Sequence, residues 1–326
     1  MLRCCLDSVR VQKDTTFEIV LVDNGSTDGS VDMARREFAD VPITFVQNPD
    51  NRGFCAANNQ GISVARGEFV ALLNNDAEAS PGWLRALLTA FEGRPTVGMA
   101  ASKIVDWENP QVIDKVGHLI YLDGQNRGRG SGQRDIGQFE TVEEVLWPDG
   151  CACMYRAEML RQIGGFDEDF FAYADDAELG LRARIAGWGC LYIPGAVVRH
   201  RRGSTLGVVS SARIELIERN RVLLAAKLFP WSLLWLNGAY YLARIAAGAL
   251  AAARGRGEVR RFTGTRAKLR LISSLIRADL RAIPMLPLML RKRRRIEGIR
   301  KLTPRQVREL LIRFRIPLRE LTEQAI

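Results

Sequence analysis

Apolar and polar positions change rhythm repeatedly between residue 3 and residue 205. Continuous apolar runs of about five residues are typical of buried strands, and here they alternate with stretches of helical periodicity. Because the connections are short, this alternation predicts a doubly wound, mostly parallel α/β sheet. We expect strands at 18–22, 43–46, 69–73, 151–155 and 190–193, and helices at 3–11, 54–65, 81–91 and 176–186. A further helix is expected to end at about Phe38, with Ser26, Thr27 or Asp28 as its N-cap.

Polar side chains follow several of the expected strands. Asp23 ends the first run, two amides and Asp76 end the run at 69–73, and His200 follows the last run. Open α/β sheets bind ligands outside the carboxyl ends of their strands. We therefore expect these three side chains to face one cleft, where a carboxylate suits a divalent cation that carries a phosphorylated ligand. Each of them also fits an ordinary turn or cap, so a purely structural role is the alternative.

A pair of acids, Asp175 and Asp176, opens the helix expected at 176–186 and can face the same cleft. Acids at a helix start also interact favourably with the helix dipole, which is the structural alternative for this pair.

Residues 106–149 are irregular and rich in Gly, Asp and Arg. A long segment of this kind predicts an excursion over the binding edge, as a lid or as a platform for the acceptor.

The chain from residue 208 onwards has a different character, with helical periodicity and a strong positive charge. Residues 251–326 hold 21 Lys and Arg against 6 Asp and Glu, a net charge of +15, whereas the remainder has a net charge of −5. Such a tail is suited to an anionic surface. The apolar stretch 231–253 is long enough to cross a bilayer, but Arg244 lies within it. A helix in the membrane interface or packed on a partner is therefore at least as consistent with the pattern, and a basic amphipathic helix is expected at 265–282.

The cysteines give little indication of function. The six cysteines form no CxxC pair, so the sequence indicates neither a zinc site nor a disulfide framework. A reducing, cytoplasmic setting is expected from this pattern.

Several short motifs are informative when they are taken in order. They are Val22-Asp-Asn-Gly-Ser-Thr-Asp-Gly-Ser30, Asn51-Arg-Gly-Phe54 with Asn58-Asn-Gln-Gly-Ile62, Leu73-Asn-Asn-Asp76, Gly164-Gly-Phe-Asp167 and Asp175-Asp-Ala-Glu-Leu179. This series resembles family 2 glycosyltransferases, which are inverting enzymes of the GT-A fold, and most closely their rhamnosyltransferase-like branch. The order and spacing are specific together, over about residues 3–205. The resemblance implies a GT-A catalytic domain at 1–207, followed by a helical, basic, membrane-associating region at 208–326.

The resemblance also implies roles for individual residues. Asp23 would contact the base or ribose of the nucleotide, and Asp176 would be the general base that takes a proton from the acceptor hydroxyl. Asp76 matches the last acid of the metal-binding DxD motif, through which Mg²⁺ or Mn²⁺ bridges protein and diphosphate, and His200 would assist the metal. Asn74 stands at the position of the first acid, so Asp76 would carry the metal contact alone. Further contacts to the nucleotide sugar are expected from Asn24, Asn51, Gly53, Asn58 and Asn75.

One departure from the family pattern concerns its first strand, which lies in the middle of the sheet. In the family this strand precedes the helix that begins here near Leu2, and the sequence shows no such strand. We therefore expect a catalytic domain that is incomplete at its N-terminal end, with unpaired backbone groups and open apolar faces at the gap. An upstream extension is expected to restore binding of a nucleotide sugar.

The sequence is thus interpreted as an inverting glycosyltransferase that uses a nucleoside diphosphate sugar and a glycan or lipid-linked acceptor in cell-surface polysaccharide synthesis. It would act at the inner face of a bacterial cell membrane, as a peripheral protein held by its basic C-terminal region. An inactive homologue that serves as an assembly partner in glycan synthesis is the alternative that the missing strand leaves open. Nucleic-acid binding is disfavoured, because the basic tail has few interleaved aromatics beyond Phe262 and Phe314.

Overall fold

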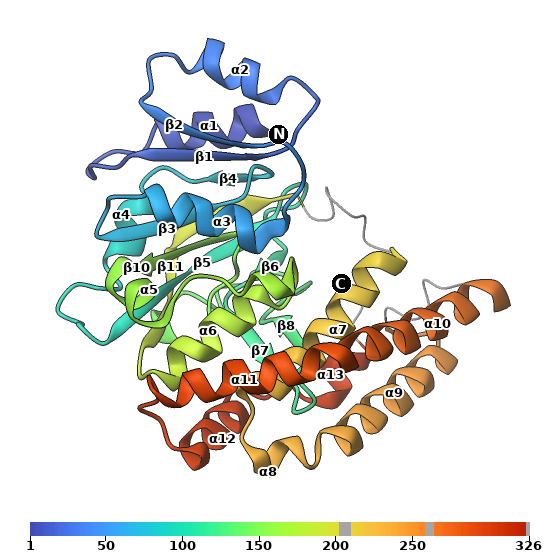
Figure 1. The fold of residues 1–326 in the computed structure, drawn as a ribbon. Coiled ribbons are helices and arrows are strands. Elements are labelled where there is room, and N and C mark those ends of the chain that lie inside the picture. Colours follow the sequence, from blue (N-terminus) through green and yellow to red (C-terminus); the bar gives the residue numbers. More distant parts are fainter. Residues whose placement is uncertain (202–209, 258–263, 324–326) are drawn as a thin grey trace.

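The computed structural model describes residues 1–201, 210–257 and 264–323, and its elements form the α/β fold that the sequence predicts. One end of the molecule is a two-stranded parallel sheet (Figure 1). Its small core of Leu6, Ala34 and Phe38 joins the sheet to the helices beside it. This unit contains β1 (Ile19–Asn24), β2 (Ile43–Asn48), α1 (Leu2–Arg10) and α2 (Ser30–Glu37), and α3 (Gly53–Val64) packs on β1.

The main sheet has seven strands, with the path β3–β10–β5–β11–β4 and with β6 and β9 paired at its sides. It is mixed: β5 and β11 run parallel, whereas β10 is antiparallel to both of its neighbours. Buried clusters cover it, and the larger one also takes side chains from the C-terminal helices. The strands are β3 (Phe69–Leu73), β4 (Ala77–Ala79), β5 (Val97–Asp106), β6 (Ile113–Lys115), β9 (Glu143–Glu144), β10 (Ala152–Arg156) and β11 (Gly189–His200), and a separate pair is formed by β7 (His118–Ile120) and β8 (Asn126–Gly128). The helices between them are α4 (Trp83–Leu88), α5 (Ala157–Ile163), the short η1 (Glu168–Phe170) and α6 (Asp175–Ile185).

The expected strands and helices are present within a few residues of their predicted bounds, except that the last strand, expected at 190–193, extends to His200. The expected cap of α2 is wrong, because the residue that precedes the helix is Gly29 with a φ of 77° and no side-chain cap. Asp28 instead accepts hydrogen bonds from the backbone and hydroxyl of Ser30. Only glycine adopts a left-handed backbone conformation easily, and the turn requires that conformation at this position. The residue before the helix is therefore a glycine, which has no side chain that could cap it.

The two sheets do not join. In the described part of the chain, β1 pairs with β2 and β3 pairs with β10, and no ladder connects β1 to β3. Every residue of both strands nevertheless lines the same cleft. The apolar residues of β1 are only half-buried as a result. That a further strand belongs between β1 and β3 stays a prediction.

The C-terminal helices pack on the α/β part of the chain rather than standing apart (Figure 1). The apolar stretch 231–253 breaks into two helices, and Arg244 is buried in ion pairs with Asp123 and Glu218 at 2.6 and 2.7 Å. Among the described residues, we find no helix of the length and apolarity needed to span a bilayer. The helices are α7 (Ser211–Leu228), α8 (Trp231–Leu234), α9 (Asn237–Ala253), α10 (Thr265–Ala282), η3 (Ile283–Met285), α11 (Leu286–Glu297), α12 (Pro304–Arg313) and α13 (Leu318–Glu323).

Candidate functional site

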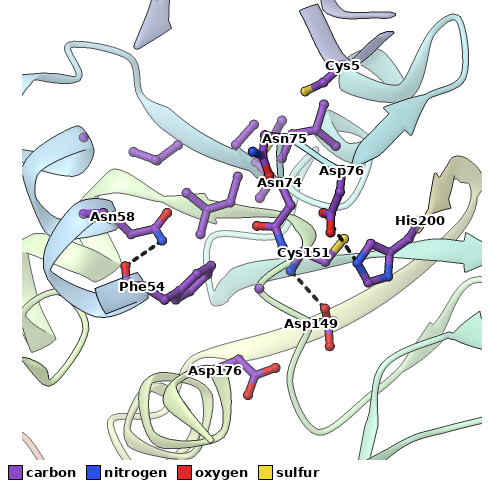
Figure 2. Close-up of a pocket in the computed structure, with 18 of the residues that line it drawn as sticks. Cys5, Phe54, Asn58, Asn74, Asn75, Asp76, Asp149, Cys151, Asp176 and His200 are labelled. Atoms are coloured by element: carbon purple, nitrogen blue, oxygen red, sulfur yellow. Dashed lines mark hydrogen bonds and ion pairs between the residues drawn. The ribbon is translucent and has the colours of Figure 1, made fainter. Parts of the chain in front are cut away.

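A cleft of about 1540 Å³ runs between the two sheets and along the carboxyl ends of their strands. Asp23, Asp76, Asp176 and His200 all line it, as the sequence predicts. Figure 2 shows Asp76 and His200 facing each other, with Asp149 and Asp176 in the same pocket. The cleft therefore brings together residues that are far apart along the chain.

The Asp76–His200 pair is created by strand pairing. His200 is the last residue of β11 and lies opposite Ala77 of β4, directly after Asp76. Its Nδ1 is 2.7 Å from Oδ2 of the fully buried Asp114, and its Nε2 lies 3.6 Å from Oδ1 of Asp76. Since Asp114 holds Nδ1, the Nε2 atom is left to face Asp76 and the cleft.

These atoms have the chemistry of a cation site. Oδ1 of Asp76 is buried and accepts no hydrogen bond from any residue that the structure describes. A buried carboxylate oxygen without a donor is costly unless something positive binds it. A carboxylate, an imidazole nitrogen and a supporting Asp114 on the far ring nitrogen form the usual arrangement around a protein-bound metal. The side chains of Asp76 and His200 therefore fit a divalent cation.

Asp176 lies at the start of α6, where Ala174 has a left-handed φ of 55°. The turn before it is fastened by Asn220 of α7, whose Nδ2 donates to the carbonyls of Phe170, Ala172 and Tyr173 at 2.7 to 2.8 Å. Asn220 is fully buried. The C-terminal helices therefore help to place Asp176 in the cleft.

A second group of buried side chains surrounds Asp176. Nε2 of His118 lies 3.4 Å from Oδ2 of Asp176 and 2.9 Å from Oδ2 of Asp149. Lys115 approaches the same Asp149 oxygen at 2.5 Å. A lysine and a histidine thus lie against two acids in this part of the cleft.

Burial and neighbouring charges shift the acids of this group in opposite directions. Burial would raise the pKa of Asp149, but the charges of Lys115 and His118 outweigh it and hold that pKa well below its usual range. Burial raises the pKa of Asp176, and the negative charge of Asp149 adds to the rise, although His118 opposes it. Burial and the charge of Asp176 raise the pKa of Asp175 well above its usual range. Two neighbouring carboxylates with separated pKa values are the pattern expected at a site of acid–base chemistry.

The group formed by His118, Asp149 and Asp176 also has the spacing of a metal site, since one ligand atom from each lies within 4.8 Å of the others. Lys115 argues against a cation at this place. Its ammonium group already contacts Asp149 and supplies the positive charge. Asp76 and His200 are therefore the better candidates for a metal.

The side chains expected to contact the nucleotide are arranged around the end of β1. Asp23 accepts from the backbone of Ser26 at 3.2 Å and lines the cleft. Asn24 bonds Asn51 and the carbonyl of Gly53, which ties β1 to the next loop. Gly53 has a φ of 85°, and a side chain there would collide with the ring of Phe171. Asn58, whose amide donates to the carbonyl of Phe54, and Asn75 also line the cleft.

Four residues of this site are absent from the sequence-based prediction: Asp114, Lys115, His118 and Asp149. They belong to the irregular segment 106–149, where no periodicity indicates which side chains turn inward. One signal was available. The chain has only two histidines, His118 and His200, and each lies buried between two carboxylates of the cleft.

Comparisons with known proteins agree with this geometry. Residues 1–164 match the pattern of Glycosyl transferase family 2. The chain is similar to the N-acetylglucosaminyl-diphospho-decaprenol L-rhamnosyltransferase of Mycobacterium tuberculosis, with 28% identity over 62% of this chain and 72% of that protein. It shares its fold with a structure of GalNAc-T7 with UDP, GalNAc and Mn²⁺, at a TM-score of 0.56 and 14% identity over 76% of this chain and 47% of that chain. It also shares its fold with the mannosyltransferase PcManGT from Pyrobaculum calidifontis in complex with GDP-Man and Mn²⁺, at a TM-score of 0.50 and 20% identity over 86% of this chain and 83% of that chain.

Proposed function

Because the chain belongs to glycosyl transferase family 2 and is a glycosyltransferase, we propose that it moves a sugar, with inversion, from a nucleoside diphosphate sugar to an acceptor hydroxyl. The acceptor would be a glycan or a lipid-linked glycan of cell-surface polysaccharide synthesis. The observation that carries this proposal is one cleft that is lined both by a candidate cation site and by a buried acid with a raised pKa. Such a cleft can hold a diphosphate and an acceptor at the same time.

The nucleotide sugar would lie against the end of β1. The carboxylate of Asp23 can accept hydrogen bonds from a base imide or from ribose hydroxyls, which suits uracil or thymine. Asn24, Asn51 and Gly53 would shape the loop that receives the nucleotide, since they are fastened to one another by hydrogen bonds. Asn58 and Asn75 line the cleft further in and would contact the diphosphate or the sugar.

Asp76 and His200 would hold Mg²⁺ or Mn²⁺ beside the diphosphate. When bound, such a cation neutralises the negative charge that develops on the departing nucleoside diphosphate. Asp114 would keep the His200 ring in the orientation that presents Nε2 to the cleft. The chemistry of the donor set supports a hard cation, which takes oxygen ligands and keeps several waters.

Asp176 would act as the general base. It would accept the acceptor hydroxyl's proton while that oxygen bonds to the anomeric carbon and the bond from this carbon to the diphosphate breaks. The leaving diphosphate takes the electron pair of the broken bond. A base works best when its pKa lies near the pH at which the enzyme operates, and burial moves Asp176 in that direction.

Two observations support the proposed acceptor class, one from a relative and one from the surface of the C-terminal helices. The printed name of the mycobacterial relative specifies a sugar on a diphospho-decaprenol. In this chain α10 exposes Leu269, Ile272, Ile276 and Leu280, each with more than half of its surface accessible. These side chains recur at helical spacing beside basic residues, which suits a helix lying on an anionic membrane. We infer that α10 brings the enzyme to the inner face of the membrane, where a lipid-linked acceptor is found.

A donor screen would test the proposed function. The full chain would be incubated with Mn²⁺, an N-acetylglucosaminyl diphospho-lipid and UDP-, dTDP- or GDP-linked sugars in turn, and release of the nucleoside diphosphate would be measured. We expect one donor class to give acceptor-dependent release that Asp76→Ala and Asp176→Asn abolish. A chain that binds its partners but transfers no sugar with any donor would instead support the inactive homologue, for which the unjoined edges of β1 and β3 are the structural argument.

A further inference from the structure

The group around Asp176 is built from four separate elements, which makes it more than a local ion pair. Lys115 belongs to β6, His118 to β7, Asp149 to the turn before β10, and Asp176 to α6. Contacts run in series from Lys115 to Asp149, from Asp149 to His118, and from His118 to Asp176, at 2.5, 2.9 and 3.4 Å. The proposed base is therefore the last member of a chain of polar contacts.

The ring of His118 is fixed in a particular way. Its exposed fraction is 5%, and it stacks on Trp147 with ring centroids 6.0 Å apart. Nε2 faces both carboxylates, whereas Nδ1 is buried and has no hydrogen-bond partner among the described residues. A histidine that served only to fill space would not leave one nitrogen unsatisfied while it directs the other at two acids. The orientation of the ring is consistent with a role for the Nε2–H.

Resting on the proposed role of Asp176 as the general base, we propose that His118 is a positioning residue, held by Lys115 and Asp149, that orients the Asp176 carboxylate toward the acceptor hydroxyl. Nε2 of His118 lies 2.9 Å from Oδ2 of Asp149 and 3.4 Å from Oδ2 of Asp176, so the two acids share its N–H. Oδ1 of Asp176 accepts from the backbone N–H of Ala177 at 2.7 Å, and the two contacts together fix the rotation of the carboxylate. In the transfer step the acceptor proton moves to Asp176, and His118 neither gains nor loses a proton. Lys115 keeps Asp149 ionised, and the ionised Asp149 holds the ring in place.

Other titratable groups also surround Asp176. They are Asp175 on its own helix, Asp149, Lys115 and His118 beside it, and Cys153 and Tyr155 on β10. Burial raises the pKa of both the Cys153 thiol and the Tyr155 hydroxyl well above their usual ranges, so these two groups stay neutral. An N–H that points at a carboxylate favours its ionised form. Loss of the His118 N–H should therefore raise the pKa of Asp176 and move the acidic limb of the rate profile to higher pH.

The test compares four full-chain variants with the wild type: His118→Phe, His118→Gln, Asp176→Asn and Tyr192→Phe. Phe keeps a ring against Trp147 but removes the donor, whereas Gln restores an N–H donor. Tyr192→Phe is the matched control, because it removes a hydrogen bond from a fully buried ring, to the Phe139 carbonyl, away from the cleft. The probes are dTDP-L-rhamnose, Mn²⁺ and an N-acetylglucosaminyl diphospho-lipid, with kcat and KM measured across the pH range. Binding of dTDP with Mn²⁺ reports whether each variant is folded.

We expect His118→Phe to lower kcat by about 10- to 100-fold, the loss typical of a misplaced reacting group, with little change in the KM for the donor. Its acidic limb should move to higher pH, and His118→Gln should recover a substantial part of both effects. If His118→Phe does not fold, the same comparison is made between His118→Gln and the wild type, with a smaller shift expected in the same direction.

Two results would overturn the inference, and they are distinguishable from each other. If Asp176→Asn is inactive while the His118 variants match Tyr192→Phe in kcat and in pH profile, His118 does not position the base, and the proposed function stands. If Asp176→Asn keeps its activity, Asp176 is not the base, and the proposed function fails together with the inference.

Discussion

Two histidines of this protein each lie between two carboxylates, but they contact these carboxylates through different ring nitrogens. His200 uses both ring nitrogens: Nδ1 bonds Asp114, and Nε2 faces Asp76. His118 uses one nitrogen for both of its acids, and its Nδ1 has no partner among the described residues. One histidine and two aspartates therefore make each of two sites, and the two sites differ in chemistry within one cleft.

The difference shows that the role of a histidine depends on whether its second carboxylate contacts Nδ1 or Nε2. A carboxylate on Nδ1 fixes the ring so that Nε2 offers a lone pair, which is what a metal requires. A ring nitrogen that faces two carboxylates must carry a hydrogen. Nε2 of His118 is therefore a hydrogen-bond donor and cannot be a metal ligand. Lys115 strengthens the contrast, because a cation of the protein already occupies the space near Asp149. We accordingly propose that the metal binds at His200 and that His118 orients the proposed base, Asp176.

The largest effect should follow from removing the metal carboxylate. Asp76→Ala should reduce sugar transfer by about 10³-fold, since a bound metal contributes several kcal/mol of charge stabilisation in the transition state. Stabilisation of the fold by dTDP should no longer depend on Mn²⁺, as measured by thermal unfolding with and without the ion. Asp32→Asn, an exposed acid on α2 outside the cleft, serves as the control. If stabilisation of Asp76→Ala by dTDP still depends on Mn²⁺, the metal instead binds at the group of His118, Asp149 and Asp176.

A smaller effect is expected at the residue behind the histidine. Asp114→Asn keeps the shape of the side chain but weakens its hold on Nδ1 of His200. The affinity for Mn²⁺ in the presence of dTDP should fall by about 10- to 100-fold, as is usual when a supporting carboxylate is lost. Titration calorimetry measures this directly. If the affinity is unaltered, the ring orientation does not depend on Asp114.

The pH profile tests the other group, and its sign can be worked out. Asp176 works as a base only when ionised, so activity is present above its raised pKa and is lost as the pH falls through it. Asp149→Asn removes a negative charge beside Asp176 and leaves Lys115 without that partner, and both changes lower the pKa of Asp176. The acidic limb should therefore move to lower pH, opposite to the shift expected for His118→Phe. A shift of both variants in the same direction would refute the electrostatic account of this group.

The mildest effect concerns the surface of α10. Ile272→Asp together with Ile276→Asp places two charges in the exposed apolar stripe of that helix. Binding to vesicles that contain anionic phosphatidylglycerol should weaken several-fold in flotation, while transfer to a water-soluble acceptor is kept. Ile136→Asp is the control, as an exposed apolar residue of a distant loop. Equal flotation of all three proteins would show that α10 does not contact the membrane.

The sequence predicts one of these histidine sites far better than the other. Asp76, His200 and Asp176 stand at the ends of strands or at the start of a helix, where periodicity and sheet geometry place side chains at one edge. Lys115, His118 and Asp149 lie in a segment whose conformation is set by tertiary contacts, such as the pairing of β6 with β5 and the stacking of His118 on Trp147, and no local pattern reports those contacts. The break of 231–253 into two helices has a similar cause, because Arg244 finds its partners Asp123 and Glu218 only in the folded chain.

The central claim is that the two groups divide the work, with the cation at Asp76 and His200 and the base at Asp176. It is tested most directly by measuring Mn²⁺-dependent dTDP binding and sugar transfer side by side in Asp176→Asn. The account predicts binding equal to that of the wild type with transfer lowered by about 10²- to 10⁴-fold, the contribution of a general base. Loss of Mn²⁺-dependent binding in this variant would show that Asp176 is a metal ligand, and retained transfer would show that it is not the base.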